Sequence, residues 1–381
     1  MSKSVSCLLA VLAVACVAVA PTTASPSLIK GVYDEAQTLY GNPDRSFPML
    51  GQLRTGALRV NLYWGGEFGV STGRRPANAT NPDDPAYDWG IYDRTVHYAS
   101  QYGMKVVFSI WGTPGWANRF RGLRYAPLNS ADLQKFTFAA AKRYGGNWIG
   151  EDGRGIPRVN YWLAWNEPNN PAFLFPQYRL VKGKAVIASA KDYAKICNAV
   201  VNGVHQARIR SQKIACGVTA PRGNNNPSTL RASISPLPFL RAMKAAGAKG
   251  FDAYAHHPYY GKPTETPATK PPPAVKNNAI TLGNIGDLIK EVTRLYGNKR
   301  IWITEYGYQT KPPDRTFGVS FANQAKYLTQ AYALARKNPR IDMLLWFLMR
   351  DDPRPAGWQS GFLTSSGAKK PSFTAFQRVP K

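Results

Sequence analysis

Short apolar runs rich in β-branched and aromatic residues recur along the chain, and longer amphipathic stretches separate them. Runs of this length, bounded by turn-forming residues, predict strands that are buried on both faces. Eight are found: Leu28–Tyr33, Leu58–Trp64, Lys105–Trp111, Asn160–Glu167, Ile214–Thr219, Phe251–Pro258, Ile301–Glu305 and Met343–Met349. The spacing between them leaves room for one helix after each strand.

Several of the intervening stretches carry apolar residues at helical spacing, namely Tyr92–Ala99, Ser130–Ala139, Gln324–Ala335 and Phe373–Arg378. Ser130 is a predicted N-cap. Strands buried on both faces that alternate with helices belong to a parallel sheet. Eight such units close into a barrel, so the predicted fold is an α/β chain of the (β/α)8 TIM barrel type in a single domain over residues 25–381.

A doubly wound open sheet is the alternative fold. It normally carries a glycine-rich phosphate loop after its first strand, and residues Tyr33–Gln37 form no such loop. The chain of 381 residues exceeds the ~250 residues typical of a (β/α)8 barrel. The surplus is expected in loops, the largest being Gly65–Asp88 and Gly261–Asn278.

Residues 1–24 have the pattern of a secretory signal: a basic start, an apolar run, and small residues before a proline. Cleavage is expected after Ala20 or Ala24. The apolar run is shorter than the roughly 20 residues of a membrane span, so no transmembrane segment is expected. A lipoprotein modified at Cys16 is the alternative, but it needs a leucine-like residue where the chain has Ala13. We therefore expect a secreted, extracellular protein.

Outside this segment the chain holds two cysteines, Cys197 and Cys216. In an oxidising compartment they could form a disulfide, and two buried thiols on neighbouring elements are the alternative. The chain has only 4 histidines, and none stands at a spacing that suits zinc. We expect neither a metal nor any other cofactor.

The composition excludes a disordered chain, because 44% of the residues are hydrophobic and 12% aromatic. The formal net charge of +27 favours attraction to polyanions such as an acidic polysaccharide, a teichoic-acid-like wall or a phospholipid surface. A generally basic, solvated surface without a dedicated ligand is the alternative. The basic residues are spread along the whole chain without any nucleic-acid-binding motif, so no nucleic-acid partner is expected. The expected oligomeric state is a monomer.

Two predicted strands, the fourth and the seventh, end in a carboxylate: Glu167 and Glu305. Barrel enzymes place catalysis at the carboxyl ends of the strands. Along the seventh strand a period of two puts Ile301, Ile303 and Glu305 on one face. If the isoleucines fill the barrel, Glu305 points into its mouth.

A pair of carboxylic acids is what cleavage of a glycosidic bond requires. One protonates the leaving oxygen, and the other attacks the anomeric carbon or activates water. Strands four and seven lie across the barrel opening from each other, so Glu167 and Glu305 can form such a pair. Each could instead be a buried ion-pair or loop-anchoring residue. Two acids at opposing strand ends, with Asn166 beside one of them, favour the catalytic interpretation.

The sequence Trp-Asn-Glu-Pro at residues 165–168, followed by Ile-Thr-Glu-Tyr-Gly at residues 303–307, resembles the catalytic strands of glycoside hydrolase clan A. The resemblance extends over all eight strands and is nearest to families 39 and 5. It implies a retaining (β/α)8-barrel glycosidase in which Glu167 is the acid/base and Glu305 the nucleophile. By the same resemblance, Asn166 binds the 2-hydroxyl of the sugar.

Other positions resemble the clan's pattern less closely. Arg59 resembles the strand-two arginine that keeps the nucleophile ionised, and an ordinary salt bridge is the alternative. His257 and Tyr259 resemble the strand-six pair that contacts the nucleophile, although the doubled His and Tyr leave the register open. Trp346 resembles the tryptophan beneath the sugar subsite, and a core tryptophan is the alternative.

Trp64 and Trp111 also stand at predicted strand ends, where they could line a sugar cleft or simply pack in the core. The functional prediction is a secreted retaining glycosidase acting on an oligo- or polysaccharide. A barrel that binds acidic carbohydrate or a cell-envelope polymer without catalysis is the alternative, and the positive charge could also hold the protein at the cell wall. Transglycosylation would use the same residues, and the sequence does not separate it from hydrolysis.

Overall fold

The computed structural model describes residues 28–272 and 278–380. Eight parallel strands close into a barrel in the order β1-β10-β9-β8-β7-β4-β3-β2. They are β1 (Ile29–Tyr33), β2 (Ala57–Tyr63), β3 (Lys105–Trp111), β4 (Tyr161–Ala164), β7 (Lys213–Thr219), β8 (Ala253–His256), β9 (Arg300–Tyr306) and β10 (Ile341–Phe347). All eight predicted strands are therefore confirmed, and the closed order excludes the open doubly wound sheet.

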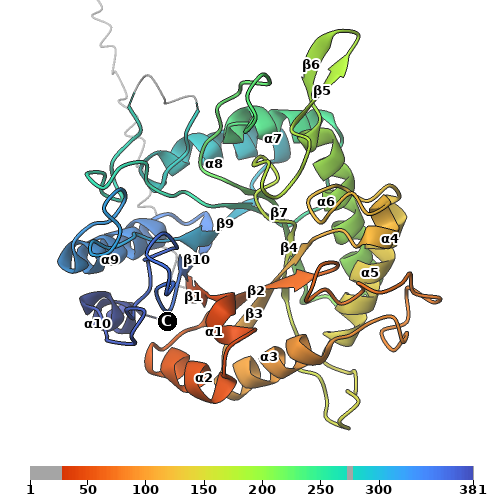
Figure 1. Ribbon diagram of the computed structural model, residues 1–381, viewed down its shortest axis with the longest axis horizontal. Coiled ribbons are helices and arrows are strands. Elements are labelled where there is room, and N and C mark those ends of the chain that lie inside the picture. The colour runs from red at the N-terminus through yellow and green to blue at the C-terminus, as the bar shows by residue number, and fades with distance from the viewer. Residues whose placement is uncertain (1–27, 273–277, 381) are drawn as a thin grey trace, which may run out of the picture.

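Helices surround the barrel, as Figure 1 shows. They are α1 (Glu35–Thr38), α2 (Pro43–Gln52), α3 (Gly90–Gln101), α4 (Gly115–Asn118), α5 (Ser130–Arg143), α6 (Ser189–Gln206), α7 (Pro236–Ala245), the 3-10 turn η2 (Leu282–Asn284), α8 (Ile285–Tyr296), α9 (Phe321–Lys337) and α10 (Pro371–Arg378). The four predicted helices lie within α3, α5, α9 and α10. None of the helices among the described residues is both long and apolar enough to cross a bilayer.

The N-cap of α5 differs from the prediction by one residue. Asn129 has an extended backbone, and its side chain accepts a hydrogen bond from the Ala131 amide at 3.0 Å. Ser130 is the first helical residue. An asparagine caps as well as a serine does, so the sequence pattern allowed either start.

The hydrophobic core has two layers. One cluster holds alternate strand residues, among them Ala57, Val107, Leu163 and Trp302, and fills the barrel. The other joins the outward strand residues to the surrounding helices. This division is expected from the period of two along each strand.

The large loops lie where surplus residues were expected. Residues 65–88 form turns without a helix or strand, and the described part of residues 261–278 does likewise. A hairpin of β5 (Tyr178–Val181) and β6 (Lys184–Ile187), which was not predicted, projects from the loop after β4 (Figure 1). The predicted signal, residues 1–24, lies outside the described residues, as does Cys16.

Cys197 on α6 and Cys216 on β7 are bonded as a disulfide, so the first of the two alternatives holds. The bond ties a helix to the barrel wall behind it. Both cysteines are fully buried.

The disulfide closes a loop with a sequence separation of 19 residues. A cross-link that closes a loop of this size lowers the conformational entropy of the unfolded chain, which raises the free energy of unfolding by about 3 kcal/mol. We expect the Cys197→Ala/Cys216→Ala variant to lose about that much free energy of unfolding, measured by urea denaturation. A reducing agent should destabilise the wild type but leave this variant unchanged. Equal stability of oxidised and reduced wild-type protein would contradict the expectation.

Candidate active site

A cavity of about 650 Å³ opens at the carboxyl end of the barrel. Its walls include side chains from β2, from the ends of β3, β9 and β10, and from the loops after β4, β7 and β8. Both predicted catalytic residues, Glu167 and Glu305, line it, and so do Asn166, Trp111 and Tyr259. The residues predicted from separate strands therefore meet in one place.

Glu305 points into this cavity, but for a different reason from the one predicted. Ile301 and Ile303 face the helices, and it is Trp302 that fills the barrel. The pairing of β9 with β10 slips between Leu344↔Ile303 and Trp346↔Tyr306, so one extra residue is accommodated on β9. Such a bulge re-aims a side chain. It brings Glu305 inward although its spacing from Ile303 alone would place it outward.

Arg59 on β2 lies at the centre of the site and is fully buried. Its Nη1 donates to Glu305 Oε1 at 2.7 Å, and its Nη2 donates to Asn166 Oδ1 at 2.7 Å. The guanidinium also stacks over the Tyr33 ring at 4.4 Å. Arg59 is thus the predicted cation beside the nucleophile position, and it pairs directly with the Glu305 carboxylate.

Glu167 follows β4 in a tight turn rather than within the strand. β4 ends at Ala164, because Trp165 and Glu167 take positive φ angles of 74° and 36°. The Glu167 amide donates to the Val218 carbonyl at 2.9 Å, at a bulge on β7. Backbone of this kind is strained and recurs at functional sites. Here it turns the Glu167 side chain into the cavity.

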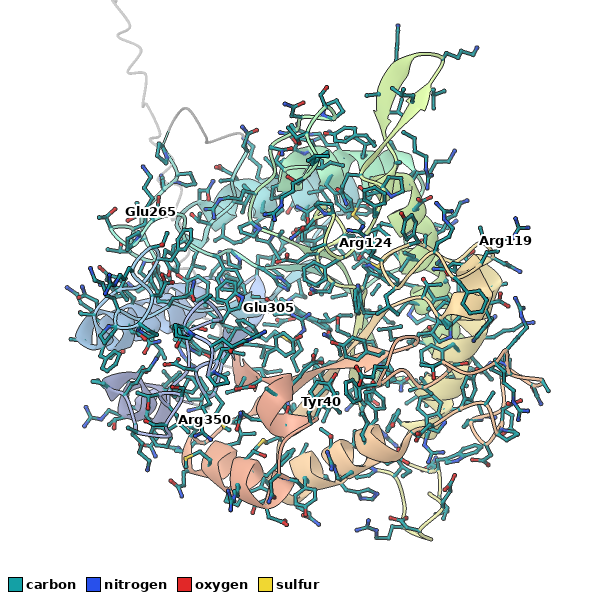
Figure 2. All side chains as sticks on the ribbon, in the orientation of Figure 1. Tyr40, Arg119, Arg124, Glu265, Glu305 and Arg350 are labelled. Atoms are coloured by element: carbon teal, nitrogen blue, oxygen red, sulfur yellow. A yellow bond between two sulfur atoms is a disulfide. The ribbon has the colours of Figure 1, made fainter. Side chains whose placement is uncertain are left out.

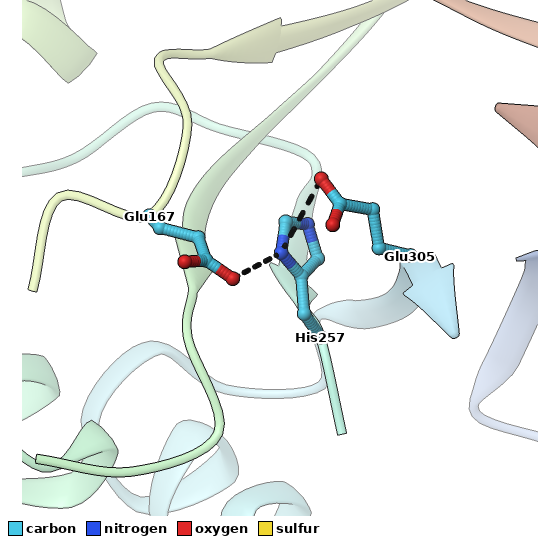
Figure 3. A group of neighbouring side chains, drawn as sticks. All are labelled: Glu167, His257 and Glu305. Carbon is cyan, nitrogen blue, oxygen red and sulfur yellow. Dashed lines mark hydrogen bonds and ion pairs between the residues drawn. The ribbon is translucent and has the colours of Figure 1, made fainter. Parts of the chain in front are cut away.

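The two carboxylates are close and lie on either side of His257 (Figure 3). One oxygen of Glu167, one oxygen of Glu305 and a His257 nitrogen all lie within 4.8 Å of one another. Burial raises the pKa of Glu167 to about 7, while the Asn170 amide and Arg59 act in the opposite direction. A carboxylic acid that keeps its proton near neutral pH can act as a general acid.

The structure settles the register of the doubled histidines. His257 Nδ1 lies 3.0 Å from Glu167 Oε1, and its Nε2 lies 3.1 Å from Arg59 Nη1. His256 instead contacts Thr219 and the Ile280 carbonyl. Burial lowers the pKa of His257 to about 3, so its ring is neutral at neutral pH. Because Arg59 can only donate, Nε2 must accept, and Nδ1–H then donates to Glu167.

Tyr259 has the expected contact, since its hydroxyl donates to Glu305 Oε2 at 3.2 Å. Asn166 accepts from Arg59 through Oδ1, which leaves its Nδ2 without a hydrogen-bond partner among the described residues. Asn166 lines the cavity. The position suits a donor to a sugar hydroxyl.

Two of the three predicted aromatic contacts are wrong. Trp346 is completely buried, and its Nε1 donates to the Ser360 carbonyl at 2.8 Å. Trp64 is equally buried and packs on Phe136. Neither lines the cavity. Side chains alternate along β10, and Trp346 is one of those that point outward to the helix layer. Trp111 does line the cavity, as predicted.

Trp358, in the loop after β10, provides an aromatic ring on the cavity wall, as was predicted of Trp346. It lines the cavity, is 43% exposed, and lies 5.5 Å from the Tyr259 ring. Phe347 lies beside it at 5.4 Å. Apolar sugar faces stack on aromatic rings in such an arrangement. No periodicity marks a loop residue such as Trp358, so no pattern in the sequence could have indicated it.

A further acid, Glu35, was also missed. Its carboxylate accepts from the Asn61 amide at 2.7 Å and the Tyr63 hydroxyl at 2.9 Å. Burial raises the Glu35 pKa to about 7. Asn61 and Tyr63 line the cavity, and their period of two from Arg59 along β2 could have indicated this.

The spacing of Glu167, His257 and Glu305 could also hold a metal ion. The charges argue against a resident cation, because Arg59 already neutralises Glu305 at 2.7 Å and would repel a second positive charge. The donor set therefore fits acid–base chemistry better than metal binding.

Barrels of this type hold their active sites at the carboxyl ends of the strands, and glycosidases cleave with a pair of carboxyl groups such as Glu167 and Glu305 provide. The family described as "Glycosyl hydrolase catalytic core" matches residues 84–376, and the chain belongs to this family. The predicted glycosidase class is thereby confirmed, together with the resemblance to clan A. No curated protein sequence matches the chain.

Solved glycosidases share the fold at low sequence identity. A glucosidase from Croceicoccus marinus has a TM-score of 0.66 at 14% identity, over 94% of this chain and 67% of that one. A family 39 glycoside hydrolase from Bacteroides cellulosilyticus WH2 has a TM-score of 0.62 at 19% identity, over 93% of this chain and 63% of that one. A GH5_18 from Bifidobacterium longum subsp. infantis has a TM-score of 0.57 at 15% identity, over 93% of this chain and 78% of that one. The chain thus spans about two thirds of the first two.

The raised pKa of Glu167 predicts how kcat/KM changes on the alkaline side of its pH profile. If Glu167 must be protonated, kcat/KM should fall as the pH rises through about 7. The Asn170 side chain donates to Glu167 Oε2 at 3.0 Å and stabilises the carboxylate. In Asn170→Ala the alkaline limb should therefore move to higher pH. An unmoved limb in kcat/KM measured against pH would refute this assignment.

Because Trp346 is buried and Trp358 is partly exposed, we expect substitution of Trp346 to affect stability and substitution of Trp358 to affect substrate binding. Trp346→Ala should lower the free energy of unfolding by about 3–5 kcal/mol, because it opens a cavity in the core. Trp358→Ala should leave stability nearly unchanged and raise KM. Thermal unfolding and steady-state kinetics on both variants decide the matter, and a stable Trp346→Ala protein with a raised KM would restore the original assignment.

Proposed function

We propose that the protein is an exported retaining glycosidase that hydrolyses O-glycosidic bonds of an oligo- or polysaccharide by double displacement. The observation that carries this proposal is the spacing of Glu167 and Glu305, whose nearest carboxylate oxygens lie within 4.8 Å. Retaining enzymes hold their carboxyl groups about 5–5.5 Å apart, and inverting enzymes need about 6.5–9.5 Å to admit water.

In the first step Glu305 attacks the anomeric carbon while Glu167 gives its proton to the departing glycosidic oxygen. The carbon–oxygen bond breaks, and a glycosyl ester of Glu305 forms. Glu167, now a carboxylate, then takes a proton from water, which attacks the same carbon and releases Glu305. Arg59 pairs with the attacking carboxylate of Glu305, and burial raises the pKa of Glu167 to about 7, which favours its role as proton donor.

The groups around the pair support binding of a sugar. Asn166 offers to a hydroxyl its Nδ2 group, which has no hydrogen-bond partner in the described part of the chain, in line with the 2-hydroxyl contact implied by the clan. Trp111 and Trp358 supply aromatic faces on the cavity wall. The cavity shares residues with a neighbouring cavity on each side, through Asn170 and Arg222 on one and Gln309 and Phe317 on the other. A long substrate could therefore extend past the cleaved bond in both directions.

Export is supported by the disulfide between Cys197 and Cys216, since such bonds persist in oxidising compartments. We expect N-terminal sequencing of protein from the culture medium to begin after Ala20 or Ala24. The net charge of +27 supports retention at an acidic cell wall, which high salt should release.

Two other functions share the same scaffold. A carbohydrate-binding protein without catalysis would have no need of a buried acid held beside a carboxylate that is paired with Arg59. Transglycosylation would replace water with a sugar acceptor at the second step, and product analysis at high acceptor concentration distinguishes it from hydrolysis.

The covalent intermediate gives a direct test. A 2-deoxy-2-fluoro glycosyl reagent of the accepted sugar should label Glu305, as peptide mass spectrometry would show. Glu305→Gln should be inactive. The control Glu151→Gln, in a loop away from the cavity, should retain full activity. A fully active Glu305→Gln enzyme would contradict the mechanism.

The role of Glu167 has its own test. Glu167→Ala should lower turnover by about 10²–10⁴-fold on substrates with poor leaving groups, because general acid catalysis is lost. Substrates with good leaving groups should lose much less, and azide should restore their cleavage by attacking the glycosyl ester. Failure of azide rescue while Glu305 is still labelled would remove Glu167 from the acid/base role.

A further inference from the structure

The catalytic cavity continues into a second cavity of about 700 Å³. The two share Asn170 and Arg222, so they form one groove. The second cavity is lined by three arginines, Arg124, Arg222 and Arg231, and by no acidic residue. We call this part the arginine groove.

The three arginines reach the groove from two loops, Arg124 from the loop after β3 and the other two from the loop after β7. None of them makes a salt bridge with any acid among residues 28–272 and 278–380. Glu265 lies close enough to affect Arg222 electrostatically. The charges of Arg124 and Arg231 therefore have no balancing partner at the groove.

The surroundings hold the guanidinium of Arg124 in place. It donates to the Pro171 carbonyl at 3.2 Å and lies over the Phe175 ring at 4.8 Å. Arg222 similarly donates to the Tyr260 carbonyl at 3.1 Å. Each arginine keeps further N–H groups for a ligand, because a guanidinium has five. Such a fork matches the paired oxygens of a carboxylate or a sulfate.

The groove lies on the acid/base side of the catalytic pair. Asn170, which both cavities share, donates to Glu167 Oε2 at 3.0 Å. The acid/base protonates the oxygen that leaves with the second sugar, so the chain beyond that oxygen runs toward Glu167. Figure 2 shows Glu305 near the middle of the molecule and Arg124 displaced from it toward α6.

We propose that the arginine groove binds an anionic sugar, carrying a carboxylate or a sulfate, on the leaving-group side of the cleaved bond. This inference rests on the proposed role of Glu167 as acid/base. It gives the excess positive charge of the chain a specific contact with the substrate. The substrate class becomes an acidic glycan rather than a neutral one.

The test compares binding of matched oligosaccharides to the full-length Glu305→Gln protein by titration calorimetry. An oligogalacturonate and a glucuronate-containing oligosaccharide are each paired with their carboxyl-reduced forms, and a sulfated oligosaccharide is paired with its desulfated form. We expect at least one anionic form to bind about fivefold more tightly than its neutral partner in low salt. The difference should shrink as salt screens the charges. Which pair responds distinguishes carboxylate from sulfate.

Variants then locate the effect. On the Glu305→Gln background, Arg124→Glu/Arg231→Glu should abolish the preference for the anionic form, and Arg124→Gln/Arg231→Gln should reduce it partly. This graded loss would not arise from a misfolded protein. The control Arg119→Glu/Arg208→Glu makes the same charge change at exposed arginines outside both cavities and should keep the preference.

Equal binding of every anionic and neutral pair would overturn the proposal, and so would an equal loss in the control variant. Binding to Glu305→Gln needs no turnover. A wild-type enzyme that is not labelled by the fluorosugar would therefore contradict the proposed function without altering the binding result. If Glu305 is labelled but anionic and neutral oligosaccharides bind equally, the proposed glycosidase function stands and the proposed role of the arginine groove is refuted.

Discussion

The buried guanidinium of Arg59 is the group on which the site depends. A charge inside a barrel is costly unless each of its hydrogen-bonding groups finds a partner. Arg59 meets this need with Glu305, Asn166 and the His257 ring, while its Nε has no hydrogen-bond partner within residues 28–272 and 278–380. These partners come from β9, from the turn after β4 and from the segment after β8. Satisfying one charge therefore fixes the positions of three catalytic elements.

The position of Arg59 also gives the two glutamates different surroundings. Glu305 forms an ion pair with the guanidinium at 2.7 Å. Glu167 instead bonds to His257 and Asn170, and burial raises its pKa to about 7. His257 links them, since it accepts from Arg59 on one side and donates to Glu167 on the other. Two identical side chains thus meet different surroundings, because Glu305 is paired with a cation while burial raises the pKa of Glu167.

The sequence predicted the fold well, because apolar runs buried on both faces are a strong local pattern. It predicted the two glutamates because each stands at a strand end. It failed where the structure departs from a regular strand. The bulge at Glu305 and the positive φ angles at Trp165 and Glu167 have no periodic signal. Trp346 resembled a subsite residue, yet its parity on β10 places it in the outer core.

Chemistry and specificity are carried by different parts of the chain. Arg59 and Glu305 lie on strands, where hydrogen-bonded neighbours fix their geometry to within a narrow range. Trp358 and Arg124 lie on loops, which can change without disturbing the barrel. A catalytic pair held by the sheet can therefore be combined with many binding surfaces. It follows that the solved glycosidases, at 14–19% identity, share the barrel with this chain while their loops need not share its arginine groove.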